Sequence, residues 1–331
     1  MNKKNQTIVN QLIGLLAVPP LALANLVAAV LVLPLLLAAY APGRSPGVAP
    51  QGLWRLAMAP AIIAFILGVH PWLQSRWRLA IDALRPLSRQ PDIVDRASMA
   101  FDLGAWAALL LGAALAIWIS QSTRLAGWLF VYALATNIAM FGLVALSIYD
   151  GLRRVRHVKR VVAAGLALDL FDRQLLTPLA RFGQSVSLTF IGGISLSLLF
   201  QSAASLFTVE SLVTYSIQIA VALTLFFTSI WSIHLALVAA QERELTAVRR
   251  HWSRSRGELR RHLAQAGSAC RAEDAARLYD PLVVFGTYER QVLEASTWPF
   301  NPKIVKEVAA SLVAPILIYG IKVALGLPGQ T

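Results

Sequence analysis

The chain is organised around residues 212–256, LVTYSIQIAVALTLFFTSIWSIHLALVAAQERELTAVRRHWSRSR, which contain neither Pro nor Gly. The first part of this stretch is apolar and the second part is charged, yet nothing in the backbone forces a helix to stop between them. At 1.5 Å per residue, a helix over residues 212–266 is roughly 80 Å long, whereas the apolar core of a bilayer is about 30 Å thick. The sequence therefore predicts a membrane-spanning helix that continues far into water.

The part in water carries an apolar seam, and so does the helix that follows it. The seam residues are three and four positions apart, with Ser255 filling one gap, a pattern typical of a helix packed along a partner. A turn at Gly267 and Ser268 favours an antiparallel pair, in which Pro281 is expected to kink or divide the second arm. We therefore predict a helical hairpin over about 241–298. Its contact surface comprises Leu245, Val248, Trp252, Leu259 and Leu263 on the first arm and Leu278, Leu282, Phe285, Tyr288 and Val292 on the second.

The composition places the chain among membrane proteins. Of its 331 residues, 57% are hydrophobic and 14% are charged, whereas soluble domains average about 25% charged residues. The predicted fold is all-α: a polytopic membrane helical bundle of about seven spans with a cytoplasmic antiparallel helical hairpin. We expect two parts, residues 1–211 with the first five spans, and residues 212–331 with the sixth span, the hairpin and a C-terminal apolar helix.

The expected spans are separated by short or basic connections. They cover about 8–40, 53–73, 103–119, 125–149, 186–206, 212–240 and 308–327. Lys306, Glu307 and Lys322 bracket the last of these, so a helix lying in the membrane interface is the alternative there. The run 161–183, VVAAGLALDLFDRQLLTPLARFG, is too short and too charged to span, and we expect it to form an interfacial helix.

The basic residues indicate how the chain crosses the bilayer. With the N-terminus inside, most of the 30 Lys and Arg fall in inner connections; the exceptions are Arg44, Arg55, Arg124 and Lys322. This asymmetry satisfies the positive-inside rule and explains the net charge of +13 better than nucleic-acid binding does. We predict a multi-pass protein of a prokaryotic plasma membrane, with a cytoplasmic N-terminus and hairpin and with anionic lipid headgroups against its inner face.

Uncharged polar residues in the spans are the first place to look for a function. Small and hydroxyl side chains also let helices approach closely and hydrogen-bond to one another. Both interpretations stay open for a polar path between the fifth and sixth spans, formed by Ser195, Gln201, Gln218, Thr228 and His234. No catalytic, cofactor-binding or metal-binding residue is predicted, because His251 and His262 stand too far apart to chelate one ion and Cys270 is the only cysteine.

One stretch partly resembles the signature of CDP-alcohol phosphatidyltransferases, membrane enzymes that hold divalent metal with clustered Asp residues. The matching residues are Asp150, Gly151, Arg154, Gly165, Asp169 and Asp172. Ser147 and Arg173 stand where that family has further Asp residues. A membrane-lipid enzyme is therefore only a remote alternative, and the sequence contains no nucleotide-binding loop, zinc-protease motif or nucleophile elbow.

The C-terminal half resembles a loose group of uncharacterised prokaryotic polytopic membrane proteins. The shared features are a basic segment over 171–181, the charged hairpin, the break Trp298-Pro299-Phe300 and a closing apolar helix that contains Pro315. The resemblance implies a membrane protein without an assigned activity. Because aromatic side chains suit the headgroup level, we expect Trp298 and Phe300 to be interface anchors.

These observations favour a non-enzymatic membrane protein that acts through its cytoplasmic hairpin as a scaffold, a sensor or an assembly element. Its expected partners are the lipid bilayer and either further copies of itself or a cytoplasmic protein. A channel or transporter that uses the polar path is the alternative. Whether the hairpin only packs against the inner connections of its own chain stays open.

Overall fold

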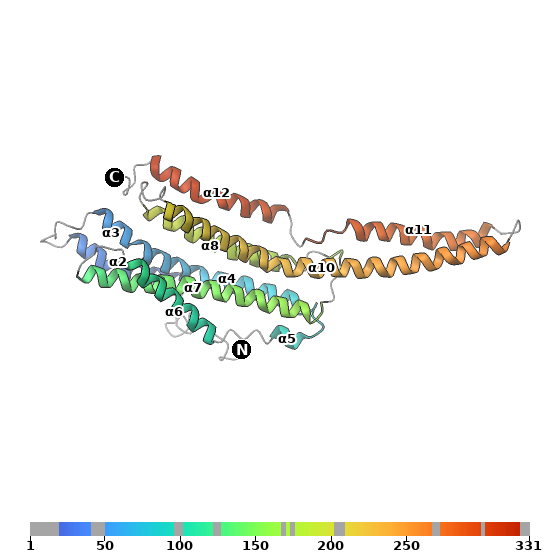
Figure 1. The fold of residues 1–331 in the computed structure, drawn as a ribbon, viewed down its shortest axis with the longest axis horizontal. Helices are drawn as coiled ribbons and strands as arrows, with labels where there is room; N and C mark the ends of the chain where they lie inside the picture. The colour runs from blue at the N-terminus through green and yellow to red at the C-terminus, as the bar shows by residue number, and fades with distance from the viewer. Residues whose placement is uncertain are drawn as a thin grey trace.

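The computed structural model describes residues 20–40, 50–95, 102–121, 127–166, 170–172, 176–201, 209–266, 272–298 and 302–324. Within these residues the protein is 91% helix and contains no strand, which confirms the predicted all-helical class (Figure 1). The helices are α2 (Pro20–Tyr40), α3 (Pro50–Leu56), α4 (Met58–Leu84), α5 (Pro91–Asp95), α6 (Leu103–Ser120), α7 (Trp128–Ala163), α8 (Thr177–Phe200), α10 (Val209–Ala266), α11 (Ala272–Glu294) and α12 (Pro302–Ala324).

Five helices in the described part of the chain are long and apolar enough to cross a bilayer. They are Leu53–Leu84, Leu103–Ser120, Trp128–Ala163, Thr177–Phe200 and Tyr215–Glu258, and they overlap the second to sixth predicted spans. α2 contributes a shorter apolar helix, and α12 contains Lys303, Lys306 and Glu307 near its start. Several apolar helices fit a membrane protein, while the number of seven spans remains a prediction.

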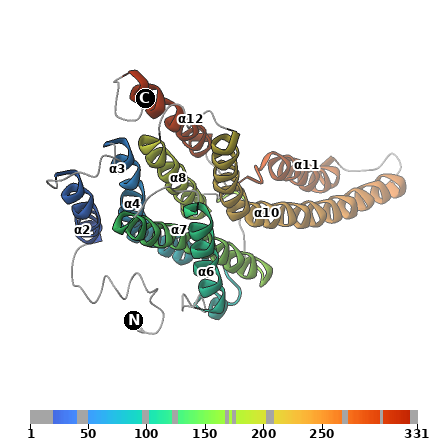
Figure 2. The same ribbon diagram turned by 60° about the vertical axis from the view of Figure 1, so that its left-hand side comes forward.

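α8 lies at the centre of the bundle and is the most buried of the five apolar helices. It packs against α4, α10 and α12, and α4 in turn packs against α2 and α7. The one extensive contact of α6 within the described structure is with α7. α6 and α12 lie on opposite sides of the bundle (Figure 1, Figure 2).

The segments predicted to face the cytoplasm meet at one end of the bundle. A single hydrophobic core there joins the ends of α4, α7 and α11, the start of α8 and the middle of α10. Trp77, Leu84, Val161, Phe182 and Ile233 are among its buried residues. The basic connections therefore share one end of the molecule, as the predicted orientation requires.

The predicted interfacial helix over 161–183 is wrong. α7 continues through the basic stretch to Ala163, and Gly165 then turns the chain with a φ of +96°, a conformation that glycine adopts without strain. α8 begins at Thr177 with Pro178 in its first turn, where a missing N–H costs no helical hydrogen bond. The physical reason is that Val158 and Val161 are buried in the core, so this part of α7 covers other helices rather than lipid.

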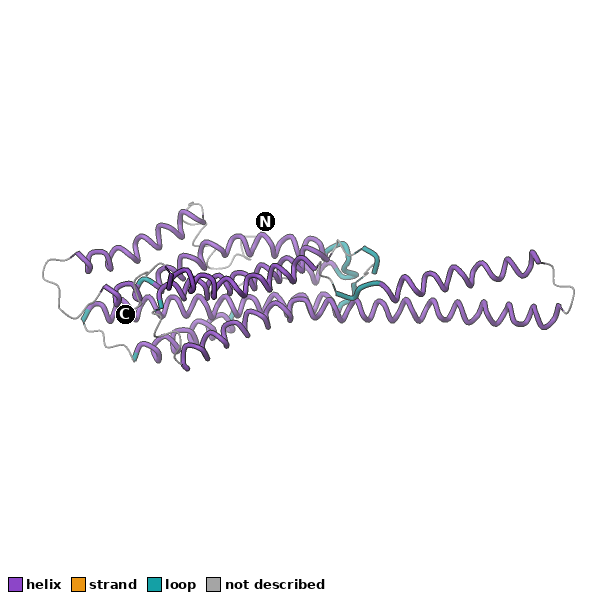
Figure 3. Tube along the Cα trace, turned by 90° about the horizontal axis from the view of Figure 1, so that it is seen from above, coloured by secondary structure: helices purple, strands orange, loops and turns teal. Residues whose placement is uncertain are grey.

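α10 is one helix of 58 residues, and α11 returns along its distal part. Figure 3 shows this pair projecting well beyond the other helices. α11 runs through position 281 as a single helix, so the predicted division at Pro281 does not occur. A proline removes one backbone hydrogen bond without necessarily ending a helix.

Candidate functional site

The joint between the bundle and the projecting pair is fixed by Gln241. Its side-chain amide donates to the carbonyl oxygen of Val292 at 2.7 Å and approaches those of Leu293 and Ala295 at 3.5 and 3.4 Å. The last carbonyls of a helix have no partner inside that helix, so Gln241 caps α11 from the side of α10. This contact sets the height on α10 at which α11 ends.

An aromatic cluster holds the chain beyond α11 against α10. The ring of His234 stacks on Trp298 with centroids 4.1 Å apart and 11° between the planes. Trp231 lies 5.5 Å from His234 and 6.2 Å from Trp298, and His234 Nδ1 lies 3.1 Å from the carbonyl oxygen of Thr297. Trp298, expected as an interface anchor, is thus part of a packed cluster, while Phe300 lies outside the described residues.

Near the joint, the seam between α10 and α11 is apolar. Val248 and Val292 are buried, and Leu245 and Tyr288 pack against the core at the end of the bundle. Tyr288 also contacts Phe171, with ring centroids 5.9 Å apart. The base of the projecting pair is therefore continuous with the core of the bundle.

Farther from the joint, the seam contains polar and aromatic contacts. The ring of His251 stacks with Phe285 at 5.9 Å, and Arg249 Nε donates to a carboxylate oxygen of Glu289 at 2.8 Å. Trp252 is half-buried beneath Arg256, whose guanidinium lies 5.2 Å from the ring centroid. The remaining predicted seam residues lie on α10 and α11, but their side chains are outside the described structure: Leu259, Leu263, Leu278 and Leu282.

A buried arginine lies at the same end of the bundle, among α4, α7 and α8. Arg154 is 5% exposed, and its guanidinium carbon lies 5.8 Å from the ring centroids of both Trp77 and Phe182. Arg154 has no hydrogen bond or ion pair to any residue that the structure describes, and its buried Nε has no partner there. Asp150, one turn earlier on α7, is the negative charge that acts on it.

Two histidines border this arginine. His157 on α7 is buried, meets Trp77 edge to face at 6.0 Å and has an Nε2 without a partner among the described residues. His70 on α4 shares a hydrogen bond of 3.0 Å with Gln74. Burying one charge costs several kcal/mol, and two aromatic rings return about 2 kcal/mol each when they are desolvated. The two contributions are comparable, which allows Arg154 to stay charged although no acidic residue in the described part of the chain forms an ion pair with it.

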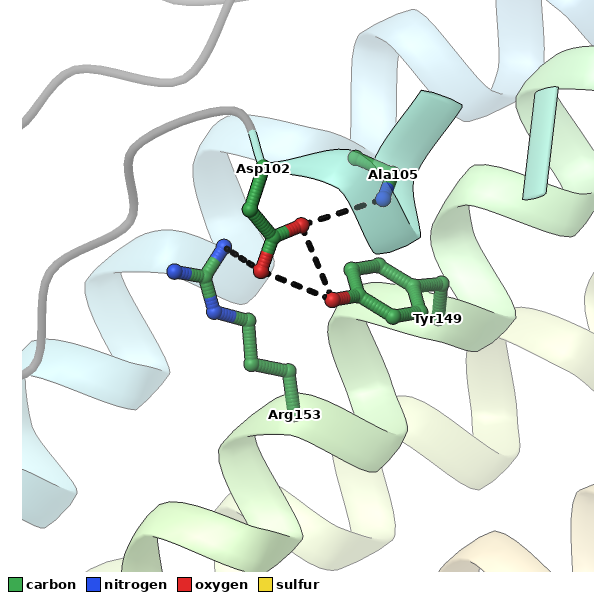
Figure 4. Close-up of polar contacts among 4 residues, drawn as sticks. All are labelled: Asp102, Ala105, Tyr149 and Arg153. Carbon is green, nitrogen blue, oxygen red and sulfur yellow. Dashed lines mark hydrogen bonds and ion pairs between the residues drawn. The ribbon is translucent and has the colours of Figure 1, made fainter. Parts of the chain in front are cut away.

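A polar cluster at the start of α6 ties that helix to α7 (Figure 4). Asp102 accepts hydrogen bonds from the amide of Ala105 at 3.0 Å and from the hydroxyl of Tyr149 at 2.9 Å, and Arg153 lies 3.7 Å away. Partial burial alone would raise the pKa of Asp102, but Tyr149, Ala105 and Arg153 together hold it below its ordinary value. Asp102 is thus both the N-cap of α6 and a cross-link to α7.

The residues of the predicted polar path do not meet at one place. Ser195 on α8 and Thr228 on α10 donate to carbonyls of their own helices, and Gln218 is exposed. Gln201 hydrogen-bonds to Tyr215 on α10, and His234 belongs to the aromatic cluster. Hydroxyls that return to their own helix are typical of structural contacts between helices, so the path stays a prediction without a common cavity among the described side chains.

The acidic residues that suggested a lipid enzyme are dispersed. Asp150 lies on α7, Asp172 is exposed in the connection to α8, and Asp169 is outside the described residues. No group of three His, Cys, Asp or Glu suited to a metal occurs among the residues described. The sequence interpretation missed the buried Arg154, because it counted the whole run from Arg153 to Arg160 among the basic residues of an inner connection. The recurrence of Val155, Val158 and Val161 beside it was the available signal for burial.

No protein-family model, no curated protein and no solved structure matches this chain. The resemblance to prokaryotic membrane proteins with a cytoplasmic hairpin therefore stays a prediction. The geometry of the described residues is the basis for a functional proposal.

Proposed function

We propose that this protein is an integral membrane protein whose α10–α11 pair projects into the cytoplasm and serves as an assembly element. The observation that carries the proposal is the continuity of α10. The helix is apolar where it packs against α7 and α8 and charged where only α11 accompanies it. We call the projecting α10–α11 pair the rod. A hydrophobic span that continues into such a pair is suited to presenting a surface at a fixed distance from the membrane.

The rod is built to stay rigid at its base. Gln241 caps α11, the aromatic cluster of Trp231, His234 and Trp298 fixes the following chain, and the seam joins the core of the bundle. A rod anchored in this way loses little conformational entropy when it binds a partner. The dispersed polar residues of α8 and α10 supply no comparable support for transport.

The cytoplasmic location can be tested with Cys270, the only cysteine of the chain, which lies between α10 and α11 in the sequence. We expect a membrane-impermeant maleimide to label Cys270 in inverted membrane vesicles and not in right-side-out vesicles. The matched control is Arg44→Cys combined with Cys270→Ser, which should show the opposite pattern. Labelling of Cys270 from the outside would overturn the proposed orientation.

The assembly role can be tested by the mass of the purified protein in mild detergent. We compare the full chain with a chain in which residues 242–296 are replaced by a short linker. The expected result is an oligomer for the full chain and a monomer for the shortened one. An oligomer that survives the replacement would show that assembly occurs elsewhere.

A further inference from the structure

The face of α10 opposite the seam carries a row of arginines. Positions 243, 247, 250, 254, 257 and 261 are four and three residues apart and hold Arg, Ala, Arg, Arg, Gly and Arg. Positions 247 to 261 each lie two residues after a seam position, and 243 lies two residues after Gln241, which contacts α11. Two residues are a rotation of about 200° around the helix, so the row faces away from α11. We call Arg243, Arg250, Arg254 and Arg261 the arginine stripe; all four are exposed.

Attraction to the headgroups of its own membrane does not account for the outer part of this stripe. The positive-inside rule is counted over about 15–20 residues from a span and so still includes Arg254, but the charge of a membrane surface acts only over a Debye length of about 8 Å. From Gln241 to Arg254 a helix rises by about 20 Å, and to Arg261 by about 30 Å. The outer arginines are therefore too far from their own membrane to be held by its headgroups.

In the described part of the hairpin, the stripe makes no side-chain hydrogen bond or ion pair with α11. Arg249, which faces α11, is the arginine that pairs with Glu289. Arg243 and Arg261 donate from Nε only to carbonyls of their own helix, those of Ala239 and Gly257. The side chains of Arg250 and Arg254 make no hydrogen bond or ion pair with any other residue in the part of the chain that the structure describes.

The opposite arm has the complementary charge. Residues 241–266 hold seven Arg and three Glu, whereas residues 272–294 hold two Arg and five acidic residues. Along α11, positions 273, 280, 287 and 294 are one heptad apart and hold Glu, Asp, Thr and Glu. Positions 280, 287 and 294 each follow a seam position by two residues, so these backbone positions share the face of α11 that is turned away from α10. We call this row the acidic face; Glu294 in it pairs with Arg290 of its own helix at 2.8 Å, and it would exchange this partner for an arginine of the neighbouring copy.

The heights of the two rows match. The contacts of Arg249 with Glu289 and of Gln241 with Val292 set which residues of α10 and α11 lie level. Copies related by rotation about the membrane normal keep the same height. On a neighbouring copy, positions 294, 280 and 273 then lie within about one helical turn, about 5 Å along the axis, of Arg243, Arg254 and Arg261, which an arginine side chain can bridge.

We infer that copies of this chain assemble side by side through their hairpins, the arginine stripe of one α10 meeting the acidic face of the neighbour's α11; this rests on the proposed assembly function. The two rows point in opposite directions, so each hairpin uses one row on each side. Such a head-to-tail contact closes into a ring when the rotation fits. Two stripes set face to face would repel, which disfavours a two-fold pairing of identical faces.

The partner that binds the arginine stripe is a second copy of this chain rather than a lipid surface or a nucleic acid. A membrane surface is excluded by the distance of the outer arginines from the bilayer, and the acidic face of α11 would repel a phosphate backbone lying across the hairpin. The exposed Val284, at 64%, lies at the level of Arg254 on the acidic side, where the aliphatic part of an arginine side chain can cover it.

The experiment reverses the charges of the arginine stripe, those of the acidic face, and then both together. We compare the oligomer of the full-length protein, in mild detergent and by cross-linking in membranes, with Arg250→Glu/Arg254→Glu, with Asp280→Arg/Glu294→Arg, and with all four substitutions combined. Each pair of substitutions should weaken self-association by about tenfold or more, and the combination should restore it, because complementary charges face each other again. Raised salt should weaken the wild-type oligomer, since the charges are exposed.

The matched control compares single substitutions: Arg260→Glu makes the same change in net charge as Arg254→Glu on the same arm, but it lies away from the stripe and from the Trp252 ring that Arg256 covers. Arg260→Glu should leave the oligomer intact. The inference is overturned if the stripe variant stays oligomeric, if the control dissociates equally, or if stripe reversal releases bound nucleic acid or another protein without changing the mass. If deleting 242–296 dissociates the protein and stripe reversal does not, the proposed function stands and this inference fails; if neither change dissociates it, both fail.

Discussion

The helix pairs α6–α7 and α10–α11 are held together in different ways, as expected if the first pair lies in lipid and the second in water. Between α6 and α7 the backbones nearly touch: a Cβ added at Gly112 would lie 2.5 Å from the carbonyl oxygen of Phe141. The outward residues of α6 are apolar, with Leu110 and Trp118 exposed by 68% and 70%. Between α10 and α11 an apolar seam is closed by Arg249 and Glu289, and charged residues cover the outside.

The difference teaches what drives helix pairing in each medium. In lipid, apolar surface gains little from burial against a neighbouring helix, so close approach of small residues and hydrogen bonds such as Asn137 to Ser120, at 3.3 Å, hold α6 to α7. In water, burial of apolar side chains is itself the driving force, and α10 and α11 need only a seam. Arg154 lies at the end of the bundle from which the α10–α11 pair projects. Its side chain is charged and buried, so neither kind of helix pairing describes its surroundings.

The largest loss of stability is expected for substitution of Arg154. Replacing Arg154 with Ala should destabilise the protein by about 2–5 kcal/mol, because a cavity opens between Trp77 and Phe182, and Asp150 loses one nearby positive charge. Thermal unfolding in detergent measures this. The control is Asp150→Asn combined with Arg154→Met, which removes both charges and keeps the volume, and should fall within about 1 kcal/mol of the wild type. Equal stability of the Ala variant would show that the guanidinium is not part of the packing.

The second-largest loss of stability is expected for a substitution that separates α6 from α7. Gly112→Leu forces the two backbones apart and should cost about 2–3 kcal/mol, measured by resistance to unfolding in detergent. Ala114→Leu on the exposed side of α6 adds the same side chain toward lipid and should be neutral. If both variants behave alike, the close approach at Gly112 is not what holds the pair together.

Truncating a buried side chain in the seam between α10 and α11 should cost as much stability as it does in the core of a soluble protein. Val292→Ala should destabilise the hairpin by about 2 kcal/mol, because the residue is fully buried and loses two methyl groups of packing. Val284→Ala makes the same chemical change on the exposed side of α11 and should have little effect. Hydrogen exchange of the α11 backbone distinguishes the two variants, and faster exchange in Val284→Ala would contradict the assigned faces.

The smallest effect is expected at the start of α6. Asp102→Ala removes the cap and the hydrogen bond from Tyr149 and should cost about 1 kcal/mol near neutral pH. Because the pKa of Asp102 lies below its ordinary 3.8 in the folded protein, its contribution is present above about pH 4 and is lost as the pH falls through the folded-state pKa. Wild type and variant should therefore converge in acid, and a stability difference that stays constant as the pH falls would contradict this role of the Asp102 carboxylate.

The regular parts of this architecture were predictable because they depend on periodicity. The apolar runs located the second to sixth spans, and the spacing of Leu245, Val248 and Val292 identified a seam on α10 and α11. The interfacial helix was wrong because it was predicted from the length and charge of 161–183, whereas Val158 and Val161 pack on helices distant in the sequence. The link from Asp102 to Tyr149 joins positions far apart in sequence, and no local pattern indicates such a contact.

Because α10 is one continuous helix, a change in the tilt of its membrane-spanning part also moves its distal part. Beyond the joint at Gln241 the helix rises by about 40 Å to its end. If the sixth span tilts by about 10°, as spans do when the thickness of the bilayer changes, the tip of the rod swings by about 7 Å. A change in the membrane is thereby converted into a displacement at the far end of the hairpin, where neighbouring rods would be drawn together or spread apart.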